Sequence, residues 1–187
     1  MQSWKRIEPT TTTKVGWRTV TSKTFQMPDG EEAVFDVLHA DGQEFAAVIG
    51  LTRDNKVIIT RQFRPGPEKI MDELPGGFVD AGELPEEAAR REFQEETGYI
   101  PEEMVYLGPF HKDTYMNSVW HGFLALHCEK QTTQQLEREE HIEVMTITIN
   151  ELISNALNDK MTDHAIVLMA YEKLQKIQKK GEYETTD

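Results

Sequence analysis

Three glutamates at helical spacing are the residues of this chain best suited to chemistry. Glu92, Glu95 and Glu96 follow a glycine-rich turn and lie at offsets of three and four residues. Because an α-helix advances about 100° per residue, their side chains project from one arc of its surface. Three neighbouring carboxylates repel one another unless a cation lies between them. Oxygen ligands alone suit Mg²⁺ or Mn²⁺, and Mg²⁺ typically binds carboxylates together with substrate phosphates.

An ordinary solvated helix is the competing interpretation of the same residues. Glu86 with Arg90, and Arg91 with Glu95, are acid and base pairs four residues apart that would stabilise a surface helix without any metal. The helical spacing alone leaves both interpretations open. The residues that surround the three glutamates, called the acidic ridge below, favour the metal site.

A longer pattern encloses the acidic ridge. The segment from Gly77 to Tyr99 fits G-x5-E-x7-R-E-U-x-E-E-x-G-U without a gap, where U is a bulky apolar residue. Phe93 and Tyr99 stand where aliphatic residues are usual in this pattern. Its fixed positions are Gly77, Glu83, Arg91, Glu92, Glu95, Glu96 and Gly98. By this pattern the chain resembles the Nudix hydrolase family.

The resemblance implies a role for each fixed residue. The acidic ridge would ligate the metals, and a pair of Arg91 with Glu83 would hold the ridge in place. Gly77, which lacks a Cβ atom, would let the backbone approach the metal or a phosphate. The implied reaction is in-line attack of an activated water on phosphorus, with the metals neutralising charge on the diphosphate. Gly98 has a simpler explanation, because it stands where the cap of a helix C-terminus belongs.

The reaction also needs a general base to remove the proton of the attacking water. An acidic stretch, residues 136–144, precedes an expected strand where related pyrophosphatases carry a catalytic loop glutamate. Glu140 is the first candidate for this base, Glu139 the second, and His141 a weaker one. The alternative is a solvated acidic loop without a catalytic role.

Substrate binding requires local positive charge, because the formal net charge of the chain is −13. Arg61 and Arg64, in the segment RQFRPG, are the candidates, although a surface-exposed strand end would explain them too. Glu73 and Phe78 flank the glycine turn and are candidates for contacts with a base or ribose. Tyr115 is a candidate for stacking on a nucleobase, with core packing as the alternative for all three.

Composition indicates a compact intracellular domain rather than a nucleic-acid or membrane protein. A length of 187 residues and 38% hydrophobic content suit one domain with at most a small appendage. Cys128 is the sole cysteine, and no apolar run approaches the roughly 18 residues of a membrane span. No basic stripe suggests a nucleic acid. We therefore expect a cytoplasmic protein with a small nucleotide substrate.

The elements that must position the ridge follow from periodicity and turn signals. Strands are expected at residues 17–26, 33–40, 45–53, 56–63, 104–107, 119–127 and 142–148, and further helices at 151–157 and 163–177, the last capped by Thr162 or Asp163. This order indicates an α+β protein, an α/β/α sandwich with a mixed central sheet and an N-terminal antiparallel strand extension. We expect an N-terminal segment at residues 1–43, the hydrolase domain at 44–180 and a polar tail at 181–187.

The N-terminal strands and the run at residues 61–77 resemble the branch that hydrolyses ADP-ribose and nucleoside diphosphate sugars. That resemblance implies a homodimer in which the N-terminal segment is a dimerisation arm. Residues 111–118 lack a proline that this branch often carries, so another substrate stays open. The alternatives are a dinucleoside polyphosphate, a nucleoside triphosphate, or a nucleotide sensor without catalytic activity.

Overall fold

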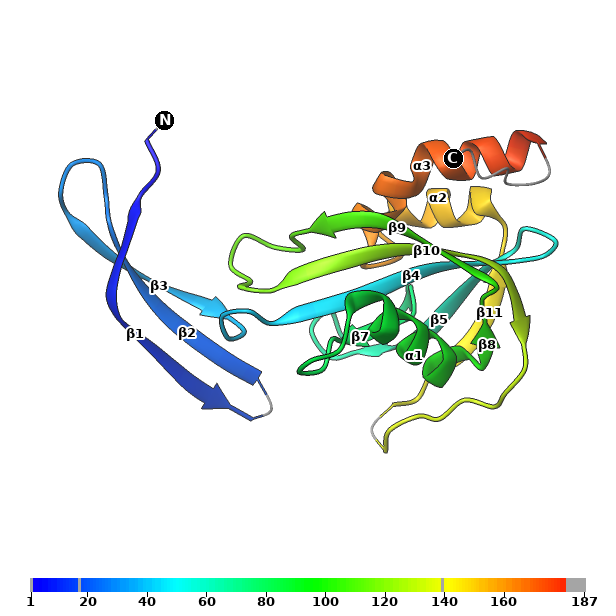
Figure 1. The fold of residues 1–187 in the computed structure, drawn as a ribbon, viewed down its shortest axis with the longest axis horizontal. Coiled ribbons are helices and arrows are strands. Elements are labelled where there is room, and N and C mark those ends of the chain that lie inside the picture. Colours follow the sequence, from blue (N-terminus) through cyan, green and yellow to red (C-terminus); the bar gives the residue numbers. More distant parts are fainter. Residues whose placement is uncertain (1, 17, 139, 181–187) are drawn as a thin grey trace. The chain divides into compact units, whose positions relative to one another are not determined.

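The chain forms two compact units in the computed structural model, which describes residues 2–16, 18–138 and 140–180 (Figure 1). Unit 1 contains residues 1–44 and 111–119, and unit 2 contains residues 45–110 and 120–187. The sequence did not indicate that residues 111–119 group with the N-terminal strands. The domain boundary at residue 43 stays a prediction, and the tail at 181–187 lies outside the described residues.

Unit 1 is built on an antiparallel meander of β1 (Lys5–Val15), β2 (Arg18–Gln26) and β3 (Glu32–Leu38). The sequence predicted β2 and β3 but not β1, whose side chains are mostly exposed and give no buried alternation. The register of β1 on β2 shifts between Ile7 and Thr11, around Pro9, which has no N–H to donate. The segment 111–119 extends this meander, because the Leu38 N–H donates to the Tyr115 carbonyl (2.8 Å).

Unit 2 contains a mixed sheet in the order β11-β5-β4-β10-β8, with β6 on β5, β7 on β4 and β9 on β10. Its strands are β4 (Glu44–Thr52), β5 (Val57–Arg64), β6 (Lys69–Glu73), β7 (Gly76–Phe78), β8 (Tyr99–Ile100), β9 (Glu103–Phe110), β10 (Val119–Lys130) and β11 (Glu143–Ile147). The central neighbours β4 and β10 run in the same direction (Figure 1), while β5 pairs antiparallel with both β4 and β11. The predicted mixed sheet is confirmed.

Helices cover both faces of this sheet. The helix α1 (Pro85–Thr97) packs on one face, and α2 (Ile149–Leu157) and α3 (His164–Lys180) pack on the other (Figure 1). Phe93 of α1 is buried with Ala46, Val48 and Phe123 of the sheet. Leu152 and Leu174 belong to the core on the opposite face. The predicted α/β/α sandwich is therefore confirmed.

Both ends of α1 are fixed by local interactions. Pro85 occupies the first turn, and the Glu87 carboxylate accepts a hydrogen bond from the Leu84 N–H (2.9 Å). Gly98 adopts a left-handed conformation with φ 75° and caps the C-terminus, as the sequence predicted. A Cβ atom at Gly98 would lie 2.4 Å from the Thr132 carbonyl oxygen. The loop after β10 therefore lies directly against the end of α1.

The remaining expectations from composition concern Cys128 and membrane spans. Cys128 is buried, and burial raises the pKa of its thiol to about 12, so the group is protonated at neutral pH. Over the described part of the chain, every helix is too short or too polar to cross a bilayer.

Candidate functional site

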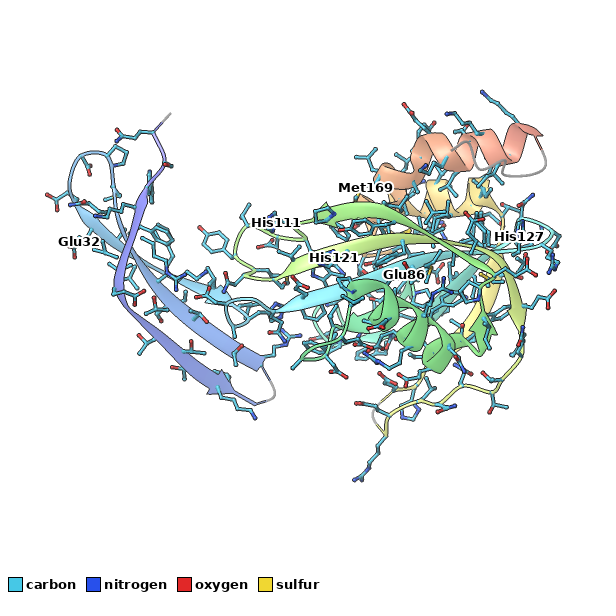
Figure 2. All side chains as sticks on the ribbon, viewed as in Figure 1. Glu32, Glu86, His111, His121, His127 and Met169 are labelled. Atoms are coloured by element: carbon cyan, nitrogen blue, oxygen red, sulfur yellow. The ribbon has the colours of Figure 1, made fainter. Side chains whose placement is uncertain are left out.

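The acidic ridge lies on the side of α1 next to the face that packs on the sheet. Ala88, Ala89 and Phe93 are completely buried against the sheet. The exposed fraction of the side chain is 18% for Glu92 and 39% for Glu95. Glu96 is the most buried of the three, with 8% of the residue exposed. Glu86, labelled in Figure 2, lies in the first turn of α1 and is half exposed.

The glycine turn approaches α1 closely enough to touch the ridge. Gly76 and Gly77 belong to β7, which pairs with Ala47 and Ala46 of β4. The Gly76 N–H donates a hydrogen bond to Glu96 Oε2 (3.0 Å). A Cβ atom on Gly77 would lie 2.4 Å from Glu92 Cδ. A side chain at this position would displace the Glu92 carboxylate, so Gly77 does bring the backbone within reach of a ridge carboxylate.

Arg91 holds the ridge from its other side. Its Nε and Nη2 atoms donate to the two carboxylate oxygens of Glu83, each at 2.9 Å. Its Nη1 atom donates to Glu92 Oε1 (2.8 Å) and to Glu95 Oε2 (3.3 Å). Its Nη2 atom also donates to the Phe78 carbonyl (3.0 Å). The pair of Arg91 with Glu83 therefore lies where the sequence placed it, and it fixes the orientation of two ridge carboxylates.

Burial and mutual repulsion make the ridge costly to ionise. Burial, aided by the charges of Glu92, Glu140 and Glu73 and opposed by the Gly76 hydrogen bond, raises the pKa of Glu96 to about 8. Burial also raises the pKa of Glu92, against the effect of Arg91 and with the help of Glu95 and Glu140. A cation beside these carboxylates would offset both costs.

The ridge fits a divalent ion by its chemistry. Among the described residues, no group of three or more His, Cys, Asp or Glu side chains is already gathered tightly enough to hold a metal. Arg91 and the Gly76 N–H draw the ridge carboxylates apart. The donor set nevertheless consists of hard oxygens, partly buried and only partly neutralised, beside a glycine backbone that a Cβ would obstruct. Such a set suits Mg²⁺ or Mn²⁺.

Glu140 comes near the ridge because its loop is hydrogen-bonded to α1. The Gln134 side chain donates to the Glu96 carbonyl (2.8 Å) and to the Ile142 carbonyl (3.1 Å). The Gln135 N–H donates to the Glu95 carbonyl (2.8 Å). Glu140 Oε2 accepts from the Glu137 N–H (2.9 Å), and its charge acts on both Glu92 and Glu96. His141 is exposed, whereas Glu139 lies outside the described residues.

The two candidate arginines on β5 lie on different faces of the sheet. Arg61 Nε donates to Asp72 Oδ1 (2.7 Å), and Asn155 of α2 donates to the other oxygen of Asp72 (3.1 Å). Arg64 Nε donates to both oxygens of Glu73, each at 2.8 Å. Burial lowers the pKa of Arg64, but the charges of Glu73 and Glu96 outweigh burial and raise it. Arg64 therefore lies near the acidic ridge.

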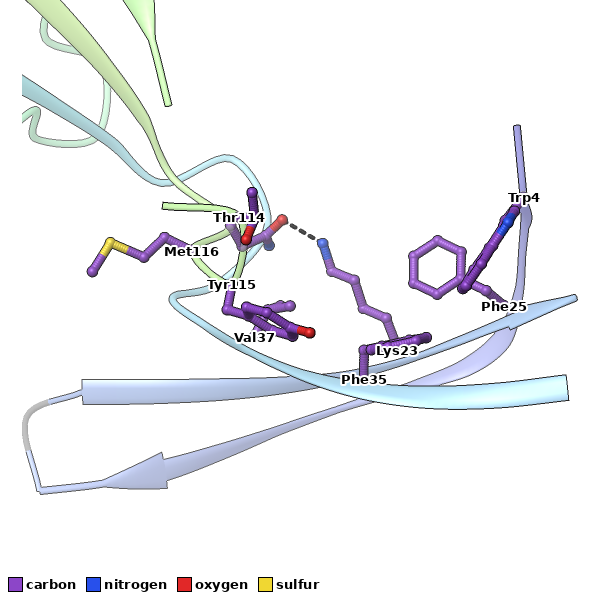
Figure 3. Close-up of a pocket in the computed structure, with 9 residues that line it drawn as sticks. Trp4, Lys23, Phe25, Phe35, Val37, Thr114, Tyr115 and Met116 are labelled. Atoms are coloured by element: carbon purple, nitrogen blue, oxygen red, sulfur yellow. Dashed lines mark hydrogen bonds between the residues drawn. The ribbon is translucent and has the colours of Figure 1, made fainter. Parts of the chain in front are cut away.

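Phe78 and Tyr115 belong to different units. Phe78, with 37% of the residue exposed, packs its ring on Phe45 at a centroid distance of 4.4 Å, and Phe45 stacks on Trp120 at 4.5 Å. Tyr115 lies in unit 1 and is 57% exposed. It lines a cavity of about 510 Å³ within that unit, drawn in Figure 3. Other lining residues are Trp4, Lys23, Phe25, Phe35 and Asn117, and the Lys23 ammonium donates to the Asn117 side chain.

Sequence reasoning missed the residues that bond the segments of the candidate site to one another. Gln134 ties the Glu140 loop to α1, and Thr162 and Asp163 bond to the strand that leads into the glycine turn. Thr162 and Asp163 were predicted only as a helix cap. No sequence pattern indicates these contacts, because the hydrogen-bond partners of Gln134, Thr162 and Asp163 are distant in sequence.

We expect Arg91→Lys to weaken Mg²⁺ binding and to lower kcat/KM by about 10-fold to 100-fold, the usual range for a residue that orients metal ligands. Lysine keeps the charge but cannot bond Glu83 with two donors while also reaching Glu92 and Glu95. Isothermal titration with Mg²⁺ measures the first effect and steady-state kinetics the second. Arg90→Lys on the same helix, which alters only the exposed pair with Glu86, is the matched control. Equal behaviour of the two variants would contradict the role given to Arg91.

The sequence matches the model of one protein family and is similar to several known proteins. A model of the NUDIX domain matches residues 43–170. The chain is 28% identical over 160 residues to the ADP-ribose pyrophosphatase of Bacillus subtilis (strain 168), covering 82% of this chain and 85% of the relative. It is also 28% identical over 153 residues to the methanol dehydrogenase activator of Bacillus methanolicus, covering 80% and 82%.

Two further comparisons concern a mammalian enzyme and a solved structure. The ADP-sugar pyrophosphatase of Mus musculus is 35% identical over 92 residues, which are 44% of this chain and 42% of that enzyme. A crystal structure of an ADP compounds hydrolase superposes with a TM-score of 0.78 at 18% identity, covering 94% of this chain and 96% of the other. This likeness concerns the fold alone, which agrees with the fold expected from the sequence.

Proposed function

The chain belongs to the NUDIX domain family, and on this premise we propose that it hydrolyses the pyrophosphate linkage of a nucleoside diphosphate joined to another moiety. It is a Nudix pyrophosphohydrolase, as the sequence pattern predicted. The observation that carries the proposal is that the glycine turn at Gly77 lies against the carboxylates of Glu92 and Glu96. Partly buried Glu92 lies against Gly77 there, buried Glu96 accepts a hydrogen bond from the neighbouring Gly76 N–H, and the positive charge of Arg64 lies nearby.

We assign the acidic ridge, Glu92, Glu95 and Glu96, as the ligands of Mg²⁺, with Mn²⁺ as the alternative ion. When bound, such an ion supplies positive charge for the diphosphate oxygens and makes a nearby water more acidic. Arg91 orients Glu92 and Glu95 for this task, and Gly77 leaves room beside Glu92. The chain thus supplies oxygen donors on one side of α1, and an ion would draw their carboxylates together from the partners that hold them now.

We assign the binding of a substrate phosphate to Arg64 and the acceptance of the proton to Glu140. The Arg64 side chain is 44% exposed while two of its nitrogens are held by Glu73, so its outer edge is accessible to a phosphate oxygen. Glu140 lies where its charge reaches both Glu92 and Glu96, and it accepts the proton of the attacking water. Arg61, on the α2 side of the sheet, is the weaker candidate for binding phosphate because Asp72 holds it there.

ADP-ribose is the substrate we favour, followed by a nucleotide sugar. Two of the relatives carry the names ADP-ribose pyrophosphatase and ADP-sugar pyrophosphatase. Phe78 supports this proposal from within unit 2, because its partly exposed ring follows directly on Gly77 and is available to a ribose or base. Tyr115 remains a candidate for stacking on a base from within unit 1.

We further propose that the protein is a cytoplasmic homodimer assembled through its N-terminal segment. The support is the apolar character of unit 1, where Trp4 and Val34 are exposed and aromatic side chains line an open cavity. Contiguous exposed apolar surface of this kind marks a site of contact with another protein. Analytical ultracentrifugation measures the assembly state directly.

The function is tested by incubating the protein with ADP-ribose, GDP-mannose, a dinucleoside polyphosphate and a nucleoside triphosphate in the presence of Mg²⁺. We expect ADP-ribose to yield AMP and ribose 5-phosphate, and EDTA to abolish turnover because the ridge alone cannot neutralise the diphosphate. Chromatography of the products identifies the bond that is cleaved. Undiminished turnover in EDTA would contradict the metal assignment, and tight binding of ADP-ribose without products would indicate a sensor.

A further inference from the structure

The strand segment that leads into the glycine turn is bonded to the chain just before α3. The Asp72 N–H donates to the Lys160 carbonyl (3.3 Å), and Asp72 forms a parallel bridge with Met161. The Leu74 N–H donates to Asp163 Oδ2 (3.0 Å). These contacts make residues 160–163 run beside the end of β6 like a short additional strand. The residues just before α3 therefore hold the backbone that precedes Gly76 in place through hydrogen bonds.

Thr162 extends this contact to a side chain of the candidate site. Its hydroxyl donates to Glu73 Oε1 (3.1 Å), while Gln62 Nε2 donates to Glu73 Oε2 (3.0 Å). Arg64 Nε lies 2.8 Å from both oxygens of the same carboxylate. Glu73 is only 5% exposed, so donors of the protein surround it. Glu73 therefore serves as a fixed anchor for Arg64 rather than as a contact for the substrate.

Asp163 acts on the opposite end of the same segment. Its carboxylate is buried, with 6% of the residue exposed, and it accepts from the Leu74 N–H. Two residues further on, the Gly76 N–H donates to Glu96 Oε2 (3.0 Å), and the Pro75 carbonyl between them accepts from the Val48 N–H (2.9 Å). Two hydrogen bonds, joined by the covalent backbone of residues 74–76, thus connect Asp163 to a carboxylate of the acidic ridge.

We propose that Thr162 and Asp163 are positioning residues of the hydrolase: Thr162 sets the place of Arg64 through Glu73, and Asp163 sets that of Glu96 through the backbone of Leu74 to Gly76. The inference rests on the proposed function, because Arg64 and Glu96 matter to catalysis only in a diphosphate hydrolase. Neither residue contacts the substrate itself. Both act by holding groups whose placement within about 1 Å decides the rate.

Helix capping is the structural role that the same two residues could have alone. The Asp163 carbonyl accepts from the Val167 N–H (3.4 Å), as expected for a residue at the N-cap of α3. A cap stabilises its helix but has no effect on a distant arginine. Thr148 offers a matched control, because its hydroxyl accepts from the Glu151 N–H (3.1 Å) at the start of α2. Its loss removes a cap without touching Glu73.

Amide hydrogen exchange tests the contribution of Asp163 without any substrate or metal. We expect Asp163→Ala to accelerate exchange of the Gly76 amide about tenfold or more, although the acceptor of that amide, Glu96, is unchanged. Asp163→Asn keeps an oxygen for the Leu74 N–H and should restore most of the protection. If Asp163→Ala fails to fold, Asp163→Ser takes its place, because serine is a good N-cap for α3 but its shorter side chain does not reach the Leu74 N–H as aspartate does. A wild-type exchange rate at Gly76 in Asp163→Ala, or in Asp163→Ser where that variant replaces it, would overturn the role of Asp163.

Steady-state kinetics with ADP-ribose and Mg²⁺ test the contribution of Thr162. We expect Thr162→Val to raise KM about tenfold, the effect of losing one hydrogen bond to a charged group, with kcat within about threefold of wild type. Thr162→Ser should restore KM, and Thr148→Val should lower the melting temperature while leaving KM unchanged. An unchanged KM in Thr162→Val, or an equal rise in Thr148→Val, would overturn this role.

The same measurements separate failure of the positioning role from failure of the proposed function. A wild-type protein that hydrolyses none of the nucleotides would overturn the function, and the exchange rate at Gly76 would still decide whether Asp163 holds the turn. For Thr162, nuclear magnetic resonance of the Arg64 Nε–H provides the equivalent readout. Its exchange should accelerate in Thr162→Val and not in Thr148→Val, and equal rates in the two variants would overturn the role of Thr162.

Discussion

Glu96→Gln should lower kcat by about 10³-fold or more while the protein stays folded. Glu96 is the most buried ridge carboxylate, and its ionised form is the one that an oxygen-binding cation requires. Glutamine keeps the shape and the acceptor for the Gly76 N–H but cannot supply the charge. A loss of several kcal/mol of electrostatic stabilisation corresponds to a fall of this size. Turnover of ADP-ribose at saturating Mg²⁺ measures it.

The matched control for this substitution is Glu86→Gln on the same helix. Glu86 is half exposed and pairs only with Arg90, so its replacement should leave kcat unchanged and stability within about 0.5 kcal/mol of wild type. Circular dichroism establishes that both variants fold. The fold itself should tolerate Glu96→Gln, because a neutral side chain avoids the cost of burying a charge. Wild-type turnover by Glu96→Gln would refute the metal ligation.

The part of the site that lies on one helix could be predicted from the sequence. Glu92, Glu95 and Glu96 share an arc because helical spacing fixes their directions. The pair of Arg91 with Glu83 was expected only from the resemblance to Nudix hydrolases, and the structure shows its hydrogen bonds. Gly77 was predicted to allow a close approach, and the structure places Glu92 against it. The directions of the three ridge side chains depend only on their spacing along one helix, so the sequence alone is sufficient to predict that they lie together.

Contacts between distant segments could not be predicted in this way. Arg61 and Arg64 were equal candidates in the sequence, but alternation along β5 places them on opposite faces of a sheet whose partners were unknown. Glu73 was a candidate for a substrate contact because it flanks the glycine turn, and its donors Gln62 and Thr162 could not be foreseen because they come from different elements. The strand β1 escaped detection because its exposed side chains lack a buried face. Tertiary pairing determines all of these features.

Glu140 was predicted only in part: the sequence indicated an acidic loop, but not the hydrogen bonds of Gln134 and Gln135 that join this loop to α1. Glu140→Gln should reduce kcat by roughly 10² to 10⁴, the range for loss of a general base, with little change in Mg²⁺ binding. The carboxylate now caps the Glu137 N–H, and its charge reaches Glu92 and Glu96. Only the ionised carboxylate can take a proton from the attacking water. Glutamine keeps an oxygen for the Glu137 N–H, so the substitution should preserve the turn of residues 137–140.

Two further substitutions in the same loop decide between the candidates. Glu139→Gln examines the second candidate base, and Glu137→Gln is a control for an acidic residue whose backbone, rather than its side chain, is bonded to Glu140. We expect both to retain turnover within about threefold of wild type, because the proton of the attacking water is assigned to Glu140. Single-turnover measurements at saturating Mg²⁺ isolate the chemical step from product release. Full activity in Glu140→Gln together with a large loss in Glu139→Gln would transfer the catalytic role to Glu139, and full activity in both would mean that the loop is an acidic surface without a base.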